Sequence, residues 1–221
     1  MKTDILYMRL FCIHKILYRI VALTMAVVLI SATFKNNIII QAQEGEIKDF
    51  PFSLYAESAV LIDGETGRVI CGKNSDNRQP NASTTKILTC IIALESCDLN
   101  DKVVISDYAA SMPEVNMDVK SGEENRLGDL LYAMMLESYN DVAVAVAEHV
   151  AGGTEEFADM MMDKVRQLGL VNTHFVNCCG LDVDGHMSSA KDVAIMSRAL
   201  INNYPQIHDY STVWTDTITY V

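Results

Sequence analysis

An apolar segment of eight residues, Ile87 to Leu94, constrains the fold of this chain more than any other feature. It is hydrophobic almost all round, which indicates a helix buried inside a core rather than lying on a surface. A serine and a lysine, Ser83 and Lys86, stand directly before it, three residues apart. Because positions i and i+3 share one helix face, we expect the lysine amine to reach the serine oxygen.

This pair of residues suggests nucleophilic catalysis. A serine hydroxyl is a poor nucleophile until a neighbouring base takes its proton. Burial disfavours the charged ammonium and lowers the pKa of a lysine, which is what Lys86 needs in order to act as that base. The alternative is a capping serine followed by a surface lysine, since S-x-x-K occurs by chance in many proteins.

A second polar element interrupts the apolar pattern farther along the chain. Ser138 and Asn140 stand between two apolar segments, 127–136 and 142–150. Buried polar groups without partners cost about 1–3 kcal/mol each, so these side chains need a reason to be there. One interpretation is a plain junction of two helices with Asp141 as N-cap. The other directs both side chains into a cleft shared with the first pair, because S-x-x-K followed by S-x-N is the motif pair of penicillin-binding proteins and β-lactamases.

A wider resemblance accompanies these two motifs. The chain resembles the serine-type D-alanyl-D-alanine carboxypeptidases, the low-molecular-weight penicillin-binding proteins, from about Ser58 to its last residue. The ordered segments that carry the resemblance are Asp63–Ile70, Asn81–Lys86, Met135–Asp141, Asn177–Asp182 and Gly185–Asp192.

The resemblance implies a role for each motif residue. Ser83 is the expected acyl-ester nucleophile, attacking the penultimate D-alanine carbonyl of a peptidoglycan stem peptide that ends in D-Ala-D-Ala. Lys86 is the expected proton acceptor, and Ser138 is the expected proton shuttle toward the leaving D-alanine. Asn140 is expected to hold Lys86 and to bind the substrate amide. The resemblance also implies covalent inhibition by β-lactams, and it implies no cofactor.

One family motif is missing from the sequence. The family has a Lys-Thr-Gly strand after S-x-N, and nothing after Asn140 matches it. Lys120–Gly122 is a near-variant, but it precedes Ser138 in a Gly/Glu loop and is predicted to be a turn. The alternating segment Tyr210–Val221 predicts a strand. We therefore expect a truncated copy, an incomplete β-lactamase/transpeptidase-like domain whose antiparallel sheet lacks its C-terminal strands.

Two other functions remain open at this point. The first is a non-catalytic remnant that at most binds muropeptides, because the third motif is absent. The second is a β-lactamase, which is less favoured. The middle motif of this chain is Ser-Tyr-Asn, and no Glu-x-x-x-Asn loop follows it that could position a deacylating water.

The N-terminal segment predicts export. Four basic residues precede the uncharged apolar segment 20–34, and small residues offer cleavage after Ala42. This pattern is typical of a signal peptide, assigned to residues 1–42. Fifteen apolar residues fall short of the roughly 20 of a spanning helix, so a retained anchor is less favoured. We expect the protein at the extracellular or cell-wall face, with membrane contact only through the leader or a missing C-terminal anchor.

Composition excludes some ligands. The formal net charge is −12, and without residues 1–42 the chain keeps 12 basic and 28 acidic residues, a net charge of −16. Nucleic-acid binding requires a basic patch, so it is not expected. The histidines lack zinc-type spacing, so no metal site is expected either. Most cysteines of the exported part are expected to be free and buried; they are Cys71, Cys90, Cys97, Cys178 and Cys179.

The coarse pattern predicts a signal peptide 1–42, a linker 43–57 and one partial transpeptidase-like domain 58–221. Its fold class is α+β, with a helix cluster packed on an antiparallel sheet. His186 is expected to be a packed loop histidine. The predicted elements are a hairpin of 58–63 and 68–71, strands at 102–105 and 173–177, helices at 127–138, 141–151 and 154–167, and a helix opened by a capping box at Ser189 that ends before Pro205.

Overall fold

The computed structural model describes residues 47–211. The predicted signal peptide 1–42, the first residues of the predicted linker and residues 212–221 of the predicted last strand lie outside the described residues. The described chain runs through β1 (Ala59–Ile62), β2 (Val69–Lys73), the 3-10 helix η1 (Ala82–Thr85), α2 (Lys86–Ser96), β3 (Lys102–Val104), α3 (Asp107–Ala110), β4 (Glu124–Arg126), α4 (Leu127–Glu137), α5 (Asn140–Ala151), α6 (Thr154–Leu168), α7 (Ala190–Asn203) and α8 (Ile207–Ser211).

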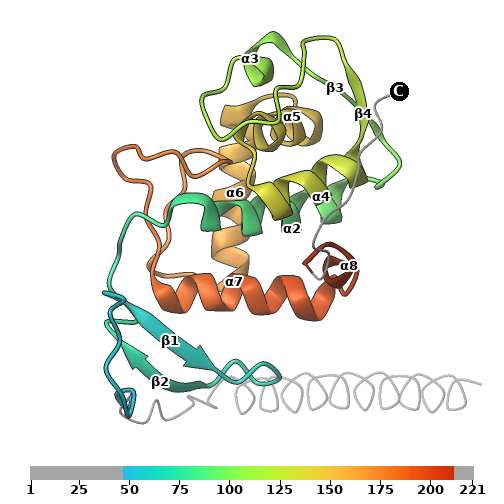
Figure 1. Ribbon diagram of the computed structural model, residues 1–221. Coiled ribbons are helices and arrows are strands. Elements are labelled where there is room, and N and C mark those ends of the chain that lie inside the picture. Colours follow the sequence, from blue (N-terminus) through green and yellow to red (C-terminus); the bar gives the residue numbers. More distant parts are fainter. Residues whose placement is uncertain (1–46, 212–221) are drawn as a thin grey trace, which may run out of the picture. The chain divides into compact units, whose positions relative to one another are not determined.

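Helix α2 forms the centre of a helix cluster, as its apolar sequence predicts. It packs against α4, α5, α6 and α7 (Figure 1). Leu88, Cys90 and Ala93 of α2 have no exposed surface, and Ile91 and Ile92 are almost fully buried. The predicted buried helix is therefore confirmed, and the core fixes the position of the residues directly before it.

Two small antiparallel sheets complete the α+β fold. Strands β1 and β2 pair with Ala59 opposite Lys73, and β1 packs against α7 (Figure 1). The hairpin turn is closed by the Asp63 carboxylate, which accepts a hydrogen bond from the Thr66 backbone N–H at 2.7 Å. Strands β3 and β4 pair farther along the chain. The predicted fold class and the hairpin are confirmed.

Helix boundaries follow from capping chemistry. The Ser189 hydroxyl accepts a hydrogen bond from the Asp192 N–H at 3.2 Å, so the predicted cap of α7 is confirmed. The segment Lys120–Gly122 is a turn, as predicted, with the Glu123 N–H donating to the Lys120 carbonyl and Gly122 at a φ of +81°. It does not substitute for the missing third motif.

The predicted strand 173–177 is wrong. Within the described chain, its only bridge is the isolated pair His174–Met187. The Phe175 N–H donates to the Met162 sulfur, and the Val176 N–H donates to His186 Nδ1, so side chains take the place of a partner strand. Alternation of polar and apolar residues does not reveal whether a backbone N–H donates to a partner strand or to a side chain.

Three short elements also differ from the sequence prediction. The short helix α3 and the strand β4 were not predicted from the sequence. Tyr210 and Ser211, predicted to begin a strand, are the last residues of α8. Elements of three to five residues carry too few periodic positions to be recognised from pattern alone.

Candidate active site

Ser83 and Lys86 lie where η1 passes into α2. The side chain of Ser83 is exposed, whereas Lys86 is only 2% exposed. Lys86 Nζ lies 3.2 Å from Ser83 Oγ, which confirms the contact expected from their spacing. Burial lowers the pKa of Lys86 below its ordinary value of 10.5, also as expected.

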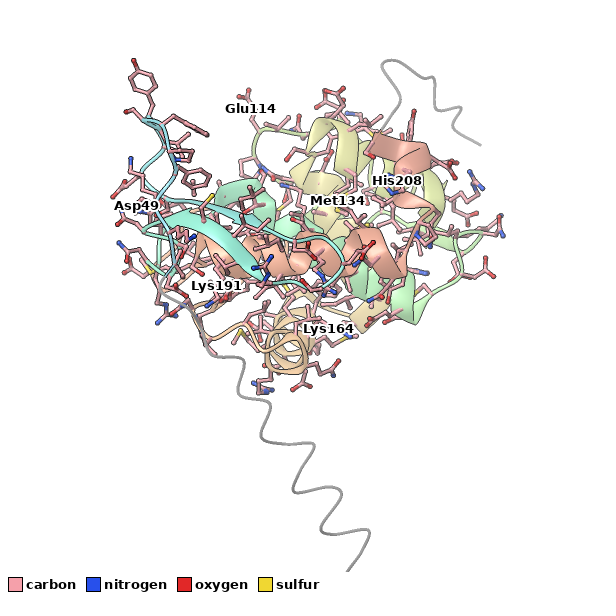
Figure 2. All side chains as sticks on the ribbon, turned by 90° about the horizontal axis from the view of Figure 1, so that it is seen from below. Asp49, Glu114, Met134, Lys164, Lys191 and His208 are labelled. Carbon is pink, nitrogen blue, oxygen red and sulfur yellow. The ribbon has the colours of Figure 1, made fainter. Side chains whose placement is uncertain are left out.

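Asn140, the first residue of α5, connects Lys86 to a loop before α4. Its Oδ1 accepts a hydrogen bond from Lys86 Nζ at 2.8 Å. Its Nδ2 donates to the Glu114 carbonyl at 2.9 Å and to the Pro113 carbonyl at 3.3 Å. These carbonyls fix which end of the amide faces the lysine. Figure 2 shows Glu114 on a loop at the edge of the molecule and Met134 among the packed helices.

A main-chain carbonyl provides the third contact of Lys86. The Cys179 carbonyl oxygen accepts a hydrogen bond from Lys86 Nζ at 2.6 Å. One residue earlier, the Cys178 carbonyl accepts from Thr89 Oγ1 at 2.7 Å. The 170–189 segment is therefore attached along the first turn of α2 (Figure 1). No sequence signal identifies this contact, because a backbone carbonyl is present at every position.

The contacts of Lys86 can be satisfied by a neutral amine. The Asn140 Oδ1 and the Cys179 carbonyl can only accept hydrogen bonds. A neutral amine has two hydrogens and one lone pair. When both hydrogens are donated to these oxygens, the lone pair is left for the third neighbour, the Ser83 hydroxyl. The geometry therefore suits transfer of the Ser83 proton to Lys86.

Ser138 is close in sequence but is not hydrogen-bonded to this cluster. Ser138 is the C-cap of α4 and has a left-handed φ of +65°. The helix therefore ends at Glu137, one residue earlier than predicted. Its Oγ is buried and has no hydrogen-bond partner among the described residues. A buried unpaired hydroxyl costs about 1–3 kcal/mol, so this serine needs a reason to be polar.

Asp141 is not the N-cap that the plain-junction interpretation requires. Residue 139 occupies the N-cap of α5, and Asp141 is 1% exposed within the helix. Its carboxylate accepts hydrogen bonds from the backbone N–H groups of Met117, at 2.9 and 3.0 Å, and of Val142, at 2.8 Å. It thereby holds the loop whose carbonyls hold Asn140.

Gly180 allows the 170–189 segment to approach the nucleophile turn. Its φ of +84° lies in the left-handed region. A Cβ built at this position would lie 2.0 Å from the Ala82 carbonyl oxygen and 3.0 Å from the Ser83 nitrogen. Both atoms belong to the backbone and cannot move aside as a side chain could. Only glycine fits this close approach.

We expect Gly180→Ala to reduce the free energy of unfolding by about 3 kcal/mol or more, because backbone strain and a main-chain clash add together. Urea denaturation measures the loss. Gly122→Ala is the matched control, since Gly122 has a φ of +81° and nothing within 4 Å of a built Cβ. It should cost only the about 1–2 kcal/mol of the left-handed conformation. Equal losses in the two variants would contradict the close contact.

His186 is hydrogen-bonded to the turn that carries Ser83. It is 2% exposed and stacks on Phe175 with ring centroids 4.9 Å apart. Its Nδ1 accepts from the Val176 N–H at 3.1 Å, so Nε2 carries the hydrogen and donates to Thr85 Oγ1 at 2.8 Å. Thr85 Oγ1 in turn donates to the Ala82 carbonyl at 2.8 Å. The predicted packed histidine is confirmed, and it is a neutral one.

We expect this histidine to make the protein sensitive to mild acid. Burial lowers the pKa of His186 below its ordinary value of 6.5, so the unfolded chain binds a proton first. The stabilisation is complete above pH 6.5 and is lost as the pH falls below it, at up to about 1.4 kcal/mol per pH unit. Urea denaturation of His186→Gln should show a shallower loss of stability below pH 6.5. His208→Gln, at an exposed position, should keep the original slope.

Comparisons with known proteins find relatives of one family. The D-alanyl-D-alanine carboxypeptidase DacF of Bacillus subtilis is 41% identical over 166 residues, covering 73% of this chain and 42% of that protein. Penicillin-binding protein 6B from Escherichia coli superposes with a TM-score of 0.72 at 30% identity, covering 78% and 58% of the two chains. Penicillin-binding protein D2 from Listeria monocytogenes, in its ampicillin-bound form, superposes with a TM-score of 0.62 at 26% identity, covering 78% and 73%.

This chain thus spans less than half of its curated relative DacF. Residues 43–221 match the family described as D-alanyl-D-alanine carboxypeptidase, Peptidase_S11. The chain therefore belongs to the D-alanyl-D-alanine carboxypeptidase family.

Proposed function

We propose that this protein is an exported serine-type carboxypeptidase that removes the terminal D-alanine from peptidoglycan stem peptides. Ser83 attacks the carbonyl of the penultimate D-alanine and forms an acyl-enzyme, while Lys86 takes the hydroxyl proton. Ser138 passes a proton to the departing D-alanine nitrogen. Asn140 holds Lys86 and binds the substrate amide. Water then releases the shortened peptide and restores Ser83.

The observation that carries this proposal is the set of three neighbours around the Lys86 amine. Two acceptor oxygens and the Ser83 hydroxyl surround Nζ at 2.8, 2.6 and 3.2 Å. A lysine whose pKa is lowered by burial is a better general base than an exposed one, because more of it is in the neutral form at a given pH. The unpaired Ser138 hydroxyl supports the proposed proton shuttle, since a bound substrate would supply its missing partner.

The backbone N–H of Ser83 is proposed to contribute to the oxyanion site. It lies at the start of the continuous η1–α2 helical segment, where free N–H groups and the helix dipole favour developing negative charge. The family's Lys-Thr-Gly strand, which recognises the substrate carboxylate, has no counterpart in this sequence after Asn140.

The test is release of free D-alanine from a synthetic stem peptide that ends in D-Ala-D-Ala. The same peptide ending in L-Ala-L-Ala is the control, and it should remain intact. Intact-protein mass spectrometry should capture a transient acyl adduct on Ser83. If neither free D-alanine nor an adduct on Ser83 is detected, the proposal is contradicted for this chain.

A second candidate follows from the missing third motif. In this alternative the chain binds muropeptides without cleaving them. Binding of the D-Ala-D-Ala peptide in a titration, together with no D-alanine release, would favour it. Sustained hydrolysis of a penicillin would instead favour the β-lactamase alternative.

Export is proposed from the sequence of residues 1–42, and β-lactams are proposed as covalent inhibitors. In the described part of the chain, no helix has both the length and the apolar character needed to cross a membrane. Secretion of a fusion of residues 1–46 to a reporter enzyme would test the leader. Lys2, Arg9, Lys15 and Arg19 supply its basic segment, and replacing all four by Glu should reduce export.

A further inference from the structure

A group of metal-ligating side chains lies at the end of α2 that is remote from Ser83. Cys97, Asp101 and His149 place a thiol sulfur, a carboxylate oxygen and a ring nitrogen all within 4.8 Å of one another. His149 Nε2 and Asp101 Oδ2 are 3.6 Å apart. All three residues are half-buried. Among the described residues, no hydrogen bond or ion pair found for these three side chains reaches Ser83, Lys86 or Asn140.

The fold holds the backbones of these residues in place. Cys97 is the C-cap of α2, and its N–H donates to the Ala93 carbonyl at 3.1 Å. The Asp101 N–H donates to the Asp98 carbonyl at 2.9 Å, and the Asp101 carbonyl accepts from the Leu127 N–H at 2.9 Å. His149 lies in the last turn of α5, which packs against α2 (Figure 1). Asp101 Oδ2 also accepts a hydrogen bond from the Asp98 N–H at 3.1 Å, which orients the carboxylate.

The donor atoms suit one class of metal ion. In a tetrahedral zinc site, with Zn–S near 2.3 Å and Zn–N or Zn–O near 2.0–2.1 Å, the donor atoms lie about 3.3–3.6 Å apart. The His149–Asp101 separation of 3.6 Å is a few tenths of an ångström longer than such a site requires for a nitrogen and an oxygen. Sulfur and imidazole ligands favour Zn²⁺ over Mg²⁺ or Ca²⁺, which prefer all-oxygen sites. A thiolate and a carboxylate together neutralise a divalent charge, and water can supply a fourth ligand.

We propose that Cys97, Asp101 and His149 form a binding site for Zn²⁺ that ties the end of α2 to the end of α5. The eleven residues of α2 separate this site from Ser83 by about 16 Å. The ion therefore acts on stability and takes no part in acyl transfer. Cys97 and His149 are 52 positions apart in the sequence, which explains why spacing motifs did not reveal the site.

Titration with Co²⁺ tests the proposal, because a cobalt–thiolate bond gives a near-ultraviolet charge-transfer band. We expect one Co²⁺ per chain, displaced by Zn²⁺, with the band absent in Cys97→Ser. His149→Gln should weaken binding at least tenfold. Cys71→Ser and His208→Gln are matched controls, since neither residue belongs to the cluster, and both should bind as the unchanged protein does.

A thermal measurement separates the site from unspecific binding. Equimolar Zn²⁺ should raise the Tm of the unchanged chain by several degrees and leave the Tm of the variant Cys97→Ser/His149→Gln unchanged. The metal-free variant should unfold cooperatively, which confirms that it folds. A Zn²⁺ effect of equal size in chain and variant, or no charge-transfer band at all, would overturn the proposal. Release of D-alanine is not needed for either readout, so failure of the catalytic proposal would leave this test intact.

Discussion

Replacing Ser83 by Ala should abolish covalent labelling by a fluorescent penicillin, with no adduct detectable by intact-protein mass spectrometry. The reason is chemical, since the acyl-enzyme bond is formed by the Ser83 oxygen and no second hydroxyl lies within reach of Lys86 Nζ among the hydrogen bonds of the described residues. The side chain is exposed and makes few contacts, so the variant should fold with unchanged stability.

Ser121→Ala is the control for this experiment. Ser121 is an exposed serine in the Lys120–Gly122 turn, which resembles the missing third motif in letters only. Its variant should be labelled as fast as the unchanged chain. Persistent labelling of Ser83→Ala would remove Ser83 from the mechanism. Absence of labelling in the unchanged, folded chain would favour the non-catalytic alternative.

Replacing Lys86 by Met should slow acylation by about 10²–10⁴-fold, the range for loss of a general base. Lys86→Arg should not restore the rate, because a guanidinium stays protonated and cannot accept the Ser83 proton. Lys120→Met removes an exposed lysine of the turn instead and should leave the rate unchanged. Stopped-flow labelling with the penicillin measures all three rate constants.

The pH dependence of acylation provides a second measure of Lys86. Only the neutral amine accepts a proton, so the rate should rise with pH as Lys86 loses its own. Because burial lowers the pKa of Lys86, the midpoint of this rise should lie below the ordinary value of 10.5. The Lys86→Met variant should lack this limb of the profile. A midpoint at or above 10.5 would contradict a desolvated lysine.

Periodicity predicted the longer elements of this fold and missed the shorter ones. Helices α2, α4, α5, α6 and α7 each contain enough apolar positions to reveal one buried face, and their predicted bounds are close to those observed. The segment 173–177 alternates like a strand, yet His186 and Met162 accept its backbone hydrogen bonds. Pairing partners that are side chains leave no periodic trace in a sequence.

Half of the candidate site could also be predicted from sequence. The spacing of Ser83 and Lys86 gives their contact directly, and the polar interruption at Asn140 pointed to a buried partner. The participation of residues 178–180 could not be foreseen. Two of their contributions are backbone carbonyls, and the third is the absence of a side chain at Gly180.

The hydrogen bond from Lys86 to the Cys179 carbonyl has a consequence for sequence variation in the family. A peptide oxygen survives replacement of its own side chain, so the hydrogen bond to Lys86 does not itself restrict which residue stands at position 179. Gly180, in contrast, cannot be replaced without a clash with the Ala82 carbonyl. A glycine at this position is therefore the sequence feature by which the same contact should be recognised in relatives.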